Sequence, residues 1–107
     1  SPFNQQNTIL NRKALQYYLA LPFIGRMDDI WPSYYTESQG CKVVYCEPTV
    51  FQDRNIQDLT KNLTDEFIGY KNTENLLYDL KKKSNNIFKY LPKKASLCFK
   101  LYKSYMI

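Results

Sequence analysis

The chain has no histidine and only three cysteines among its 107 residues. Without histidine, a zinc site would need a fourth ligand beyond the three thiols, so we expect this chain to hold no metal by itself. The cysteines at 41, 46 and 98 are odd in number and scattered, which argues against a disulfide framework. Reduced thiols in a cytoplasmic setting are the simplest interpretation.

Long apolar runs and internal repeats are also absent from the sequence. No segment approaches the roughly 18 apolar residues that a membrane-spanning helix needs, and we find no signal peptide. Hydrophobic residues make up 44% of the chain and aromatic residues 16%, which favours a folded protein. We therefore expect one folded unit at most, located in the cytoplasm or at the periphery of a membrane.

Acidic residues are missing from the last quarter of the chain. Residues 81–107 contain eight lysines and no acid, leaving −3 for residues 1–80 out of a net charge of +5. We therefore divide the chain into a body (1–80) and a lysine-rich amphipathic tail (81–107). Lysines interleaved with aromatic residues suit an anionic membrane surface. Docking on a partner protein is the alternative, and nucleic acid is less favoured because the body is acidic.

The hydrophobic pattern predicts an α/β fold in which helices dominate. Residues 7–10 and 42–46 have the composition of short strands, and 49–52 continues as an extended piece. Apolar residues at helical spacing and capping residues predict the helices, which cover residues 12–19, 29–38, 56–69, 73–80 and 95–106. In this scheme Asp28 caps the second helix and Gly69 ends the third.

The stretch of residues 25–32 carries the densest chemistry and reads GRMDDIWP. It places the charge of Arg26, the carboxylates of Asp28 and Asp29 and the ring of Trp31 near one helix start. A base that accepts a proton from a sugar hydroxyl needs a positioned carboxylate, often beside an aromatic face. The competing interpretation is that the two acids only cap a helix and interact with its dipole.

Polar residues at two other places complete the candidate site. Gln52 and Arg54 lie between an extended piece and a helix, where ligand crevices form and helix N-termini attract phosphate. Asn4 and Asn7 lie in an amide-rich N-terminal segment whose donors and acceptors suit sugar hydroxyls. An ordinary polar loop is the alternative at both places.

Three of these segments together resemble a known class of enzyme. Residues 1–8, 25–31 and 51–55, which read SPFNQQNT, GRMDDIW and FQDRN, are similar to the acceptor-side half of GT-A-type glycosyltransferases. The closest groups are the STELLO-like and reversibly glycosylated polypeptide proteins. The resemblance covers about residues 1–80 and stops before the lysine-rich tail. It implies a fold like the C-terminal half of a GT-A enzyme, with a few short strands.

The resemblance also implies roles for particular residues. Asp28 or Asp29 would be the base that activates the acceptor hydroxyl, and Trp31 would help to wall the sugar pocket. Gln52 and Arg54 would lie near the nucleotide diphosphate and its metal. The Asp-x-Asp motif that holds this metal, Mn²⁺ or Mg²⁺, does not occur in the sequence. We therefore expect the metal and the donor to be held mostly by a missing N-terminal half.

The sequence thus predicts the C-terminal portion of a nucleotide-sugar-dependent glycosyltransferase, which binds a carbohydrate acceptor, supplies a catalytic carboxylate and is inactive alone. The alternative is a non-catalytic interaction module whose basic tail binds an anionic membrane or a partner protein.

Overall fold

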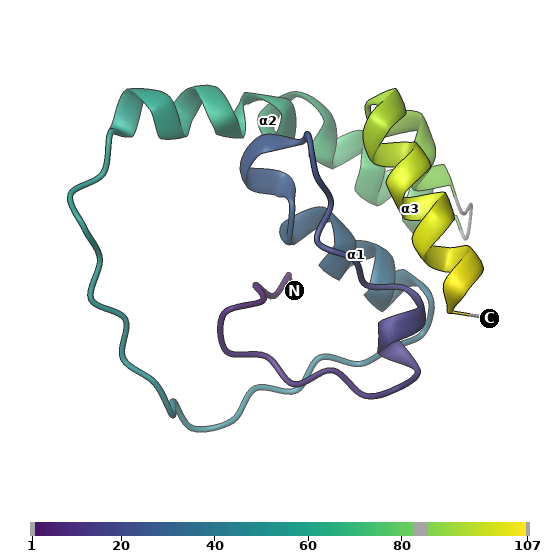
Figure 1. Cartoon of the computed structure of the whole chain (residues 1–107), viewed down its shortest axis with the longest axis horizontal. Coiled ribbons are helices and arrows are strands. Elements are labelled where there is room, and N and C mark those ends of the chain that lie inside the picture. Colours follow the sequence, from purple (N-terminus) through teal and green to yellow (C-terminus); the bar gives the residue numbers. More distant parts are fainter. Residues whose placement is uncertain (1, 83–85, 107) are drawn as a thin grey trace.

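Three α-helices and three short 3-10 helices make up the regular structure that the computed structural model describes, over residues 2–82 and 86–106. Lys83 of the predicted tail lies outside these residues, as do Ser1, Ser84, Asn85 and Ile107. In chain order the elements are η1 (Ala14–Gln16), η2 (Gly25–Met27), α1 (Ile30–Ser38), α2 (Leu59–Lys81), η3 (Asn86–Tyr90) and α3 (Lys93–Tyr105). Figure 1 shows their arrangement.

The described residues contain no strand, so the predicted α/β fold class, with its GT-A-like short strands, is wrong. Residues 7–10 and 42–46 have extended or irregular backbone instead. Between α1 and α2 the chain runs as a wide loop away from the helices (Figure 1). The physical reason is that β-branched residues indicate only compatibility with a strand, whereas a strand also needs a partner to pair its backbone.

Helix α1 confirms the prediction of a helix that ends near Ser38. Pro32 lies in its first turn, where a missing N–H removes no intrahelical bond. Gly40, at φ +89°, follows the last turn. The predicted cap is wrong, because Asp29 rather than Asp28 occupies the N-cap position and its side chain makes no capping bond.

Helix α2 is one continuous helix of 23 residues where the sequence predicted two. Its N-cap is Asp58, whose Oδ1 accepts a hydrogen bond from the Lys61 N–H at 3.1 Å. Gly69 does not end the helix. It is buried against Met27, and a Cβ at Gly69 would lie only 2.4 Å from the Met27 Sδ. The glycine therefore permits a close approach between α2 and η2.

The predicted helix over residues 12–19 shortens to the three residues of η1. Its N-cap residue is Lys13, which makes no side-chain capping bond, and the Oδ1 of Asn11 shortly before it accepts a bond from the Ala14 N–H at 2.8 Å. Residues 17–24 then have turns and irregular backbone that lead to η2.

One hydrophobic core joins α1, α2, η3 and α3. The ring of Phe99 packs edge-on against Tyr35, with centroids 5.3 Å apart. Helix α3 confirms the predicted helix over residues 95–106 and buries Ala95 and Phe99. The core therefore draws residues from both sides of the predicted boundary between residues 80 and 81. Its buried members are Leu21, Ile24, Met27, Trp31, Tyr35, Leu76, Leu80, Ile87, Leu91, Ala95 and Phe99.

Candidate functional site

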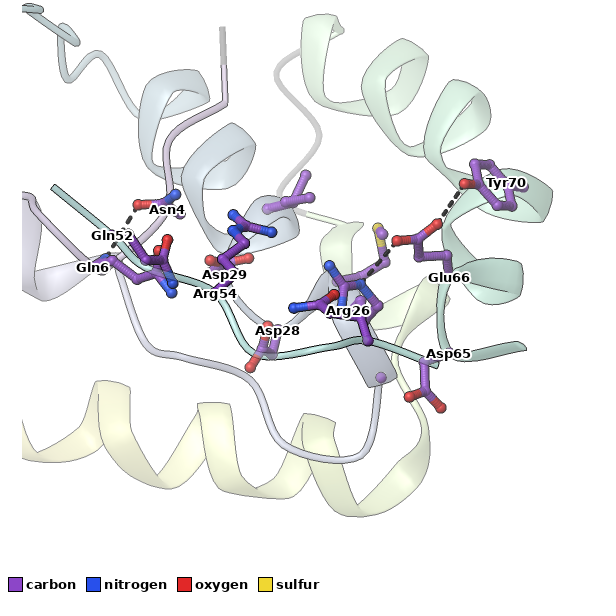
Figure 2. A pocket seen from close by; sticks show the side chains of 14 residues that line it. Asn4, Gln6, Arg26, Asp28, Asp29, Gln52, Arg54, Asp65, Glu66 and Tyr70 are labelled. Carbon is purple, nitrogen blue, oxygen red and sulfur yellow. Dashed lines mark hydrogen bonds and ion pairs between the residues drawn. The ribbon is translucent and has the colours of Figure 1, made fainter. Parts of the chain in front are cut away.

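A cavity of about 800 Å³ lies where η2 and the start of α1 face the N-terminal segment, the extended segment before α2, and one side of α2. Figure 2 shows the side chains that line it. Six of the residues selected from the sequence meet here: Asn4, Arg26, Asp28, Asp29, Gln52 and Arg54. Of the other lining residues, Gln6 lies in the amide-rich N-terminal segment, and Gly25, Met27 and Ile30 lie in the stretch 25–32. The residues that were not anticipated from the sequence are Gln57, Asp65, Glu66 and Tyr70.

The two remaining candidates lie outside this cavity. Asn7 donates a hydrogen bond from its Nδ2 to the Thr49 Oγ1 at 3.1 Å, which ties the N-terminal segment to the loop after α1. Trp31 is fully buried in the core, and its Nε1 donates to the Thr73 Oγ1 at 2.9 Å. Trp31 therefore joins α1 to α2 and does not wall a sugar pocket.

Close packing of η2 on α2 positions the two carboxylates. Gly25 has φ +59°, and a Cβ there would lie 2.3 Å from the backbone oxygen of Asp65. On the next turn of α2, Gly69 receives the Met27 side chain. The Leu21 N–H donates to the carbonyl oxygen of Asp28 at 2.8 Å. These contacts fix the turn that presents Asp28 and Asp29 to the cavity.

Burial and a neighbouring charge shift the pKa of Asp28. Its pKa is raised above the usual value of 3.8, first by burial and second by the neighbouring charge of Asp29. Backbone N–H groups of residues 28 and 29 and the charge of Arg26 oppose this increase. A carboxylate with a raised pKa is a stronger base, as proton abstraction from a hydroxyl requires.

Tyr18, which was not selected from the sequence, lies close enough to Asp28 and Asp29 for their charges to affect its pKa. Tyr18 is only 6% exposed, and its ring stacks on Phe3 with centroids 5.3 Å apart. Its hydroxyl is buried and has no hydrogen-bond partner among the described residues. Burial, and then the charges of Asp29 and Asp28, raise the pKa of Tyr18 to about 12. The hydroxyl therefore remains protonated and able to donate.

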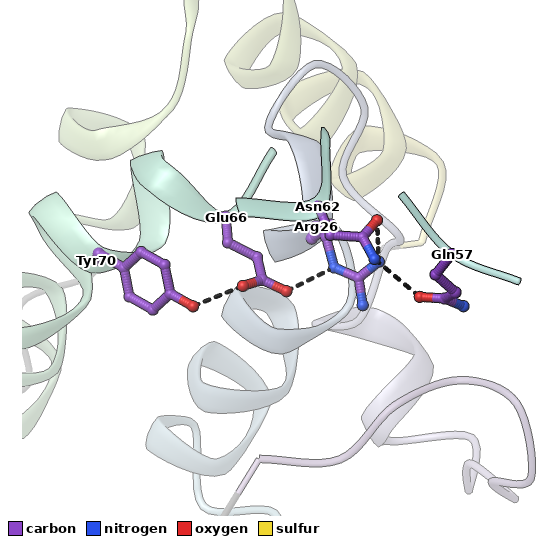
Figure 3. Close-up of polar contacts among 5 residues, drawn as sticks. All are labelled: Arg26, Gln57, Asn62, Glu66 and Tyr70. Atoms are coloured by element: carbon purple, nitrogen blue, oxygen red, sulfur yellow. Dashed lines mark hydrogen bonds and ion pairs between the residues drawn. The ribbon is translucent and has the colours of Figure 1, made fainter. Parts of the chain in front are cut away.

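A polar chain along α2 forms one rim of the cavity (Figure 3). The Arg26 Nε lies 2.8 Å from the Glu66 Oε1, and the Tyr70 hydroxyl donates to the Glu66 Oε2 at 2.5 Å. Arg26 also donates from its NH1 to the Asn62 Oδ1 at 3.2 Å, and the Asn62 Nδ2 donates to the Gln57 Oε1 at 2.8 Å. The spacing of residues 62, 66 and 70 at i, i+4 and i+8 is the sequence signal for this rim.

The cavity can position hydroxyl groups, and it has carboxylates to accept a proton. Its charged lining comprises two guanidinium groups and four carboxylates. Within the described residues, no three histidine, cysteine, aspartate or glutamate side chains cluster as metal ligands would. The described residues of the cavity therefore supply no ready set of ligands for the divalent metal that the resemblance implies.

Comparisons of the chain with protein-family models, with curated proteins and with solved structures found no match. Among the described helices, none combines the length and the apolar character needed to cross a membrane.

Proposed function

We propose that this chain is the acceptor-binding portion of a nucleotide-sugar-dependent glycosyltransferase, with Asp28 as the catalytic base. One observation carries the proposal. A partly buried carboxylate with a raised pKa lies in a cavity that gathers amide and guanidinium groups from three separate segments. Helix capping alone does not account for the acids, since the Asp29 side chain makes no capping bond at α1.

In this mechanism Asp28 accepts the proton of an acceptor hydroxyl. The acceptor oxygen forms a bond to the anomeric carbon of the donor as the bond from that carbon to the nucleotide diphosphate breaks. The diphosphate leaves with the bonding electron pair, and the proton stays on Asp28 until product release. Base catalysis of this kind contributes about 10² to 10⁴ in rate.

The other lining residues orient the substrates. Asn4 and Gln52 offer amide groups that both donate to and accept from sugar hydroxyls. Arg54 offers a guanidinium whose planar donors match a phosphate. Burial, and then the charge of Asp29, raise the pKa of Asp28. Because the sequence has no Asp-x-Asp motif, we assign most donor and metal contacts to residues outside this chain.

The test is transfer from a panel of nucleotide sugars in the complete natural protein that carries this chain. We expect Asp28→Asn to lower kcat at least about 100-fold, because it removes the base. Glu74→Gln is the matched control, since Glu74 is an exposed acid on α2 that does not line the cavity. Full turnover in Asp28→Asn would refute the assignment of the base to Asp28, and full turnover in Asp29→Asn as well would exclude both acids.

Binding to the chain itself separates loss of catalysis from loss of the site. Saturation-transfer NMR with a panel of methyl glycosides should detect acceptor contacts that Gln52→Ala weakens and Asp28→Asn retains. A complete protein that transfers no sugar, together with a chain that binds no glycoside, would leave the non-catalytic module as the better interpretation. The observation that favours this second candidate function is the row of exposed apolar side chains on α3, at Leu97, Leu101 and Tyr105.

A further inference from the structure

Helix α3 exposes an apolar stripe on the side that faces away from the core. Leu97, Leu101 and Tyr105 follow one another at intervals of four residues, and each is more than half exposed. Ala95 and Phe99, on the opposite side of the helix, are buried. Figure 1 shows α3 at the periphery of the fold, so that one side of the helix is left uncovered. The apolar residues Leu97, Leu101 and Tyr105 have the predicted helical spacing, but their side chains face solvent and not the core.

Three lysines border this stripe. Lys93, Lys94 and Lys100 each lie three or four positions from Leu97 and are therefore its neighbours on the helix surface. No carboxylate in the described part of the chain lies within ion-pair distance of any of the three.

Two nearby lysines contact other parts of the protein: Lys89 pairs with the Asp79 carboxylate at 3.8 Å, and Lys103 donates to the Tyr35 hydroxyl at 2.8 Å. The Lys100 Nζ lies 5.1 Å from the centroid of the Phe88 ring. Because neither a hydroxyl nor a ring neutralises a lysine, the positive charge of α3 has no carboxylate partner among the described residues and borders the apolar stripe.

Phe23 extends the same surface beyond the helix. Its ring is 61% exposed, and the Lys94 Nζ lies 5.6 Å from the ring centroid. The backbone of Phe23 has φ +65°, a region that bulky residues rarely adopt. The fold thus holds an exposed aromatic ring beside the lysines in a conformation that costs free energy.

A second exposed apolar stripe shows why charge decides the partner. Leu59, Leu63 and Phe67 are exposed along α2, where charges of both signs lie nearby: Asp65 and Glu66, and also Lys61 and Lys71. The described residues of α3 include lysines and no acid. An anionic surface would therefore be attracted more strongly to α3 than to α2.

We propose that the outer face of α3, formed by Leu97, Leu101 and Tyr105 with Lys93, Lys94 and Lys100, binds an anionic lipid surface. The helix would lie in the plane of the interface, with its leucines among the acyl chains and its lysines at the headgroups. Tyrosine suits this boundary because its ring is apolar and its hydroxyl is polar. Nucleic acid would use the charge but leave the leucines without a role.

Co-sedimentation of the full chain with vesicles tests the proposal. We expect binding to phosphatidylcholine vesicles that contain phosphatidylserine, weaker binding at high salt, and none to phosphatidylcholine alone. Each lysine near such a surface contributes about fivefold to the partition coefficient, so Lys93→Glu, Lys94→Glu and Lys100→Glu together should lower it by about 100-fold or more. Leu97→Ser with Leu101→Ser should also weaken binding.

The matched control is a variant of the other stripe. Leu63→Ser, Phe67→Ser and Lys71→Glu change exposed residues of α2 and should leave vesicle binding intact. Equal loss in the control variant would overturn the assignment to α3. So would absence of binding to the anionic vesicles, or binding of duplex or single-stranded nucleic acid in preference to them.

Insertion of the apolar stripe has a separate readout. The single natural tryptophan, Trp31, is fully buried, so a new tryptophan in Leu97→Trp reports on its own surroundings. Its emission should shift to the blue when anionic vesicles are added. Emission that remains unshifted while the chain sediments would refute insertion of the leucines.

Discussion

The two walls of the cavity are built in different ways. On one side, η2 packs so closely on α2 that a Cβ at Gly25 would overlap the Asp65 backbone, and a Cβ at Gly69 would displace the Met27 side chain. On the other side, residues 50–57 run as extended chain, and Phe51 is 94% exposed. The first wall carries the carboxylates, and the second carries Gln52 and Arg54.

This difference places the residues that would carry out the reaction on the packed wall, and the residues that would bind the substrate on the extended wall. A base must be held in a fixed position by packed elements, whereas contacts to a variable substrate can lie on segments with few buried neighbours. Such segments open at low free-energy cost. We therefore expect substitutions on the packed wall to affect folding and substitutions on the extended wall to affect binding alone.

The largest expected effect comes from the core behind the packed wall. Phe99→Ala should lower the free energy of unfolding by about 3–5 kcal/mol, because it leaves a cavity between Tyr35 and Phe88. Phe51→Ala, at the exposed phenylalanine of the extended wall, should change it by less than about 0.5 kcal/mol. Urea unfolding of both variants measures the contrast. Equal losses would show that the extended segment is packed as firmly as the core.

A smaller effect is expected where η2 meets α2. Gly25→Ala should destabilise the fold by about 2–4 kcal/mol, since its Cβ overlaps the Asp65 backbone oxygen and its φ is left-handed. Gly40→Ala is the control. It has φ +89° but no atom within 4 Å of the added Cβ, so only the conformational cost of about 1 kcal/mol remains. If thermal unfolding shows similar losses in both variants, the close contact contributes nothing.

The sequence predicted elements whose signals are local. Pro32 lies in the first turn of α1 and Gly40 follows its last turn, as the sequence predicted. The apolar residues at helical spacing near the C-terminus do form the helix α3. Signals that depend on a partner elsewhere in the chain failed. Gly69 reads equally well as a helix stop or as a contact point, and only Met27 decides between them. The strand at 42–46 failed because no described strand pairs with it.

The same distinction applies to the candidate site. Asp28, Asp29 and Arg54 could be selected because polar residues near the starts of helices commonly face ligands. Glu66 lies within a long helix, and the side of α2 that meets η2 is fixed only by tertiary packing. Trp31 was assigned to the pocket because an aromatic ring beside acids suits a sugar site and because the resemblance implied that role. The same ring suits a hydrophobic core equally well. Its bond to Thr73, far away in sequence, places it in the core.

The pH dependence of stability tests the packed surroundings of the carboxylates through Tyr18. An unfolded tyrosine loses its proton near pH 10.0, whereas folded Tyr18 retains it to about pH 12. Between these values the unfolded state binds fewer protons, so the free energy of unfolding falls as pH rises. At 1.36 kcal/mol per pH unit, the loss due to Tyr18 is about 2–3 kcal/mol.

Tyr18→Phe keeps the stacked ring and removes the titrating hydroxyl. Between pH 10.0 and about 12, the free energy of unfolding of this variant should therefore fall by about 2–3 kcal/mol less than that of the native chain. Tyr105→Phe is the control, because Tyr105 is exposed at the end of α3. Urea unfolding below pH 10.0 and at pH 12 supplies the two values. Parallel curves for the native chain and Tyr18→Phe would show that the hydroxyl is not buried beside the acids.

The smallest expected effect lies where the two walls meet, at the polar chain in Figure 3. A double-mutant cycle on Arg26 and Glu66, which are 40% and 26% exposed, should give a coupling free energy of about 0.5–1 kcal/mol after solvent screening. The cycle on Asn62 and Gln57 should give less than about 0.5 kcal/mol, because two neutral amides near the surface exchange one hydrogen bond for bonds to water.

Added salt separates the two couplings further. Salt screens the ion pair between Arg26 and Glu66 and should reduce its coupling, whereas the bond between Asn62 and Gln57 should respond little. The coupling between Asn62 and Gln57 could instead equal or exceed that between Arg26 and Glu66. The extended wall would then be bound to α2 as strongly as η2 is. In that case Gln52 and Arg54 are held as rigidly as Asp28, and substitutions on either wall should affect folding and binding together.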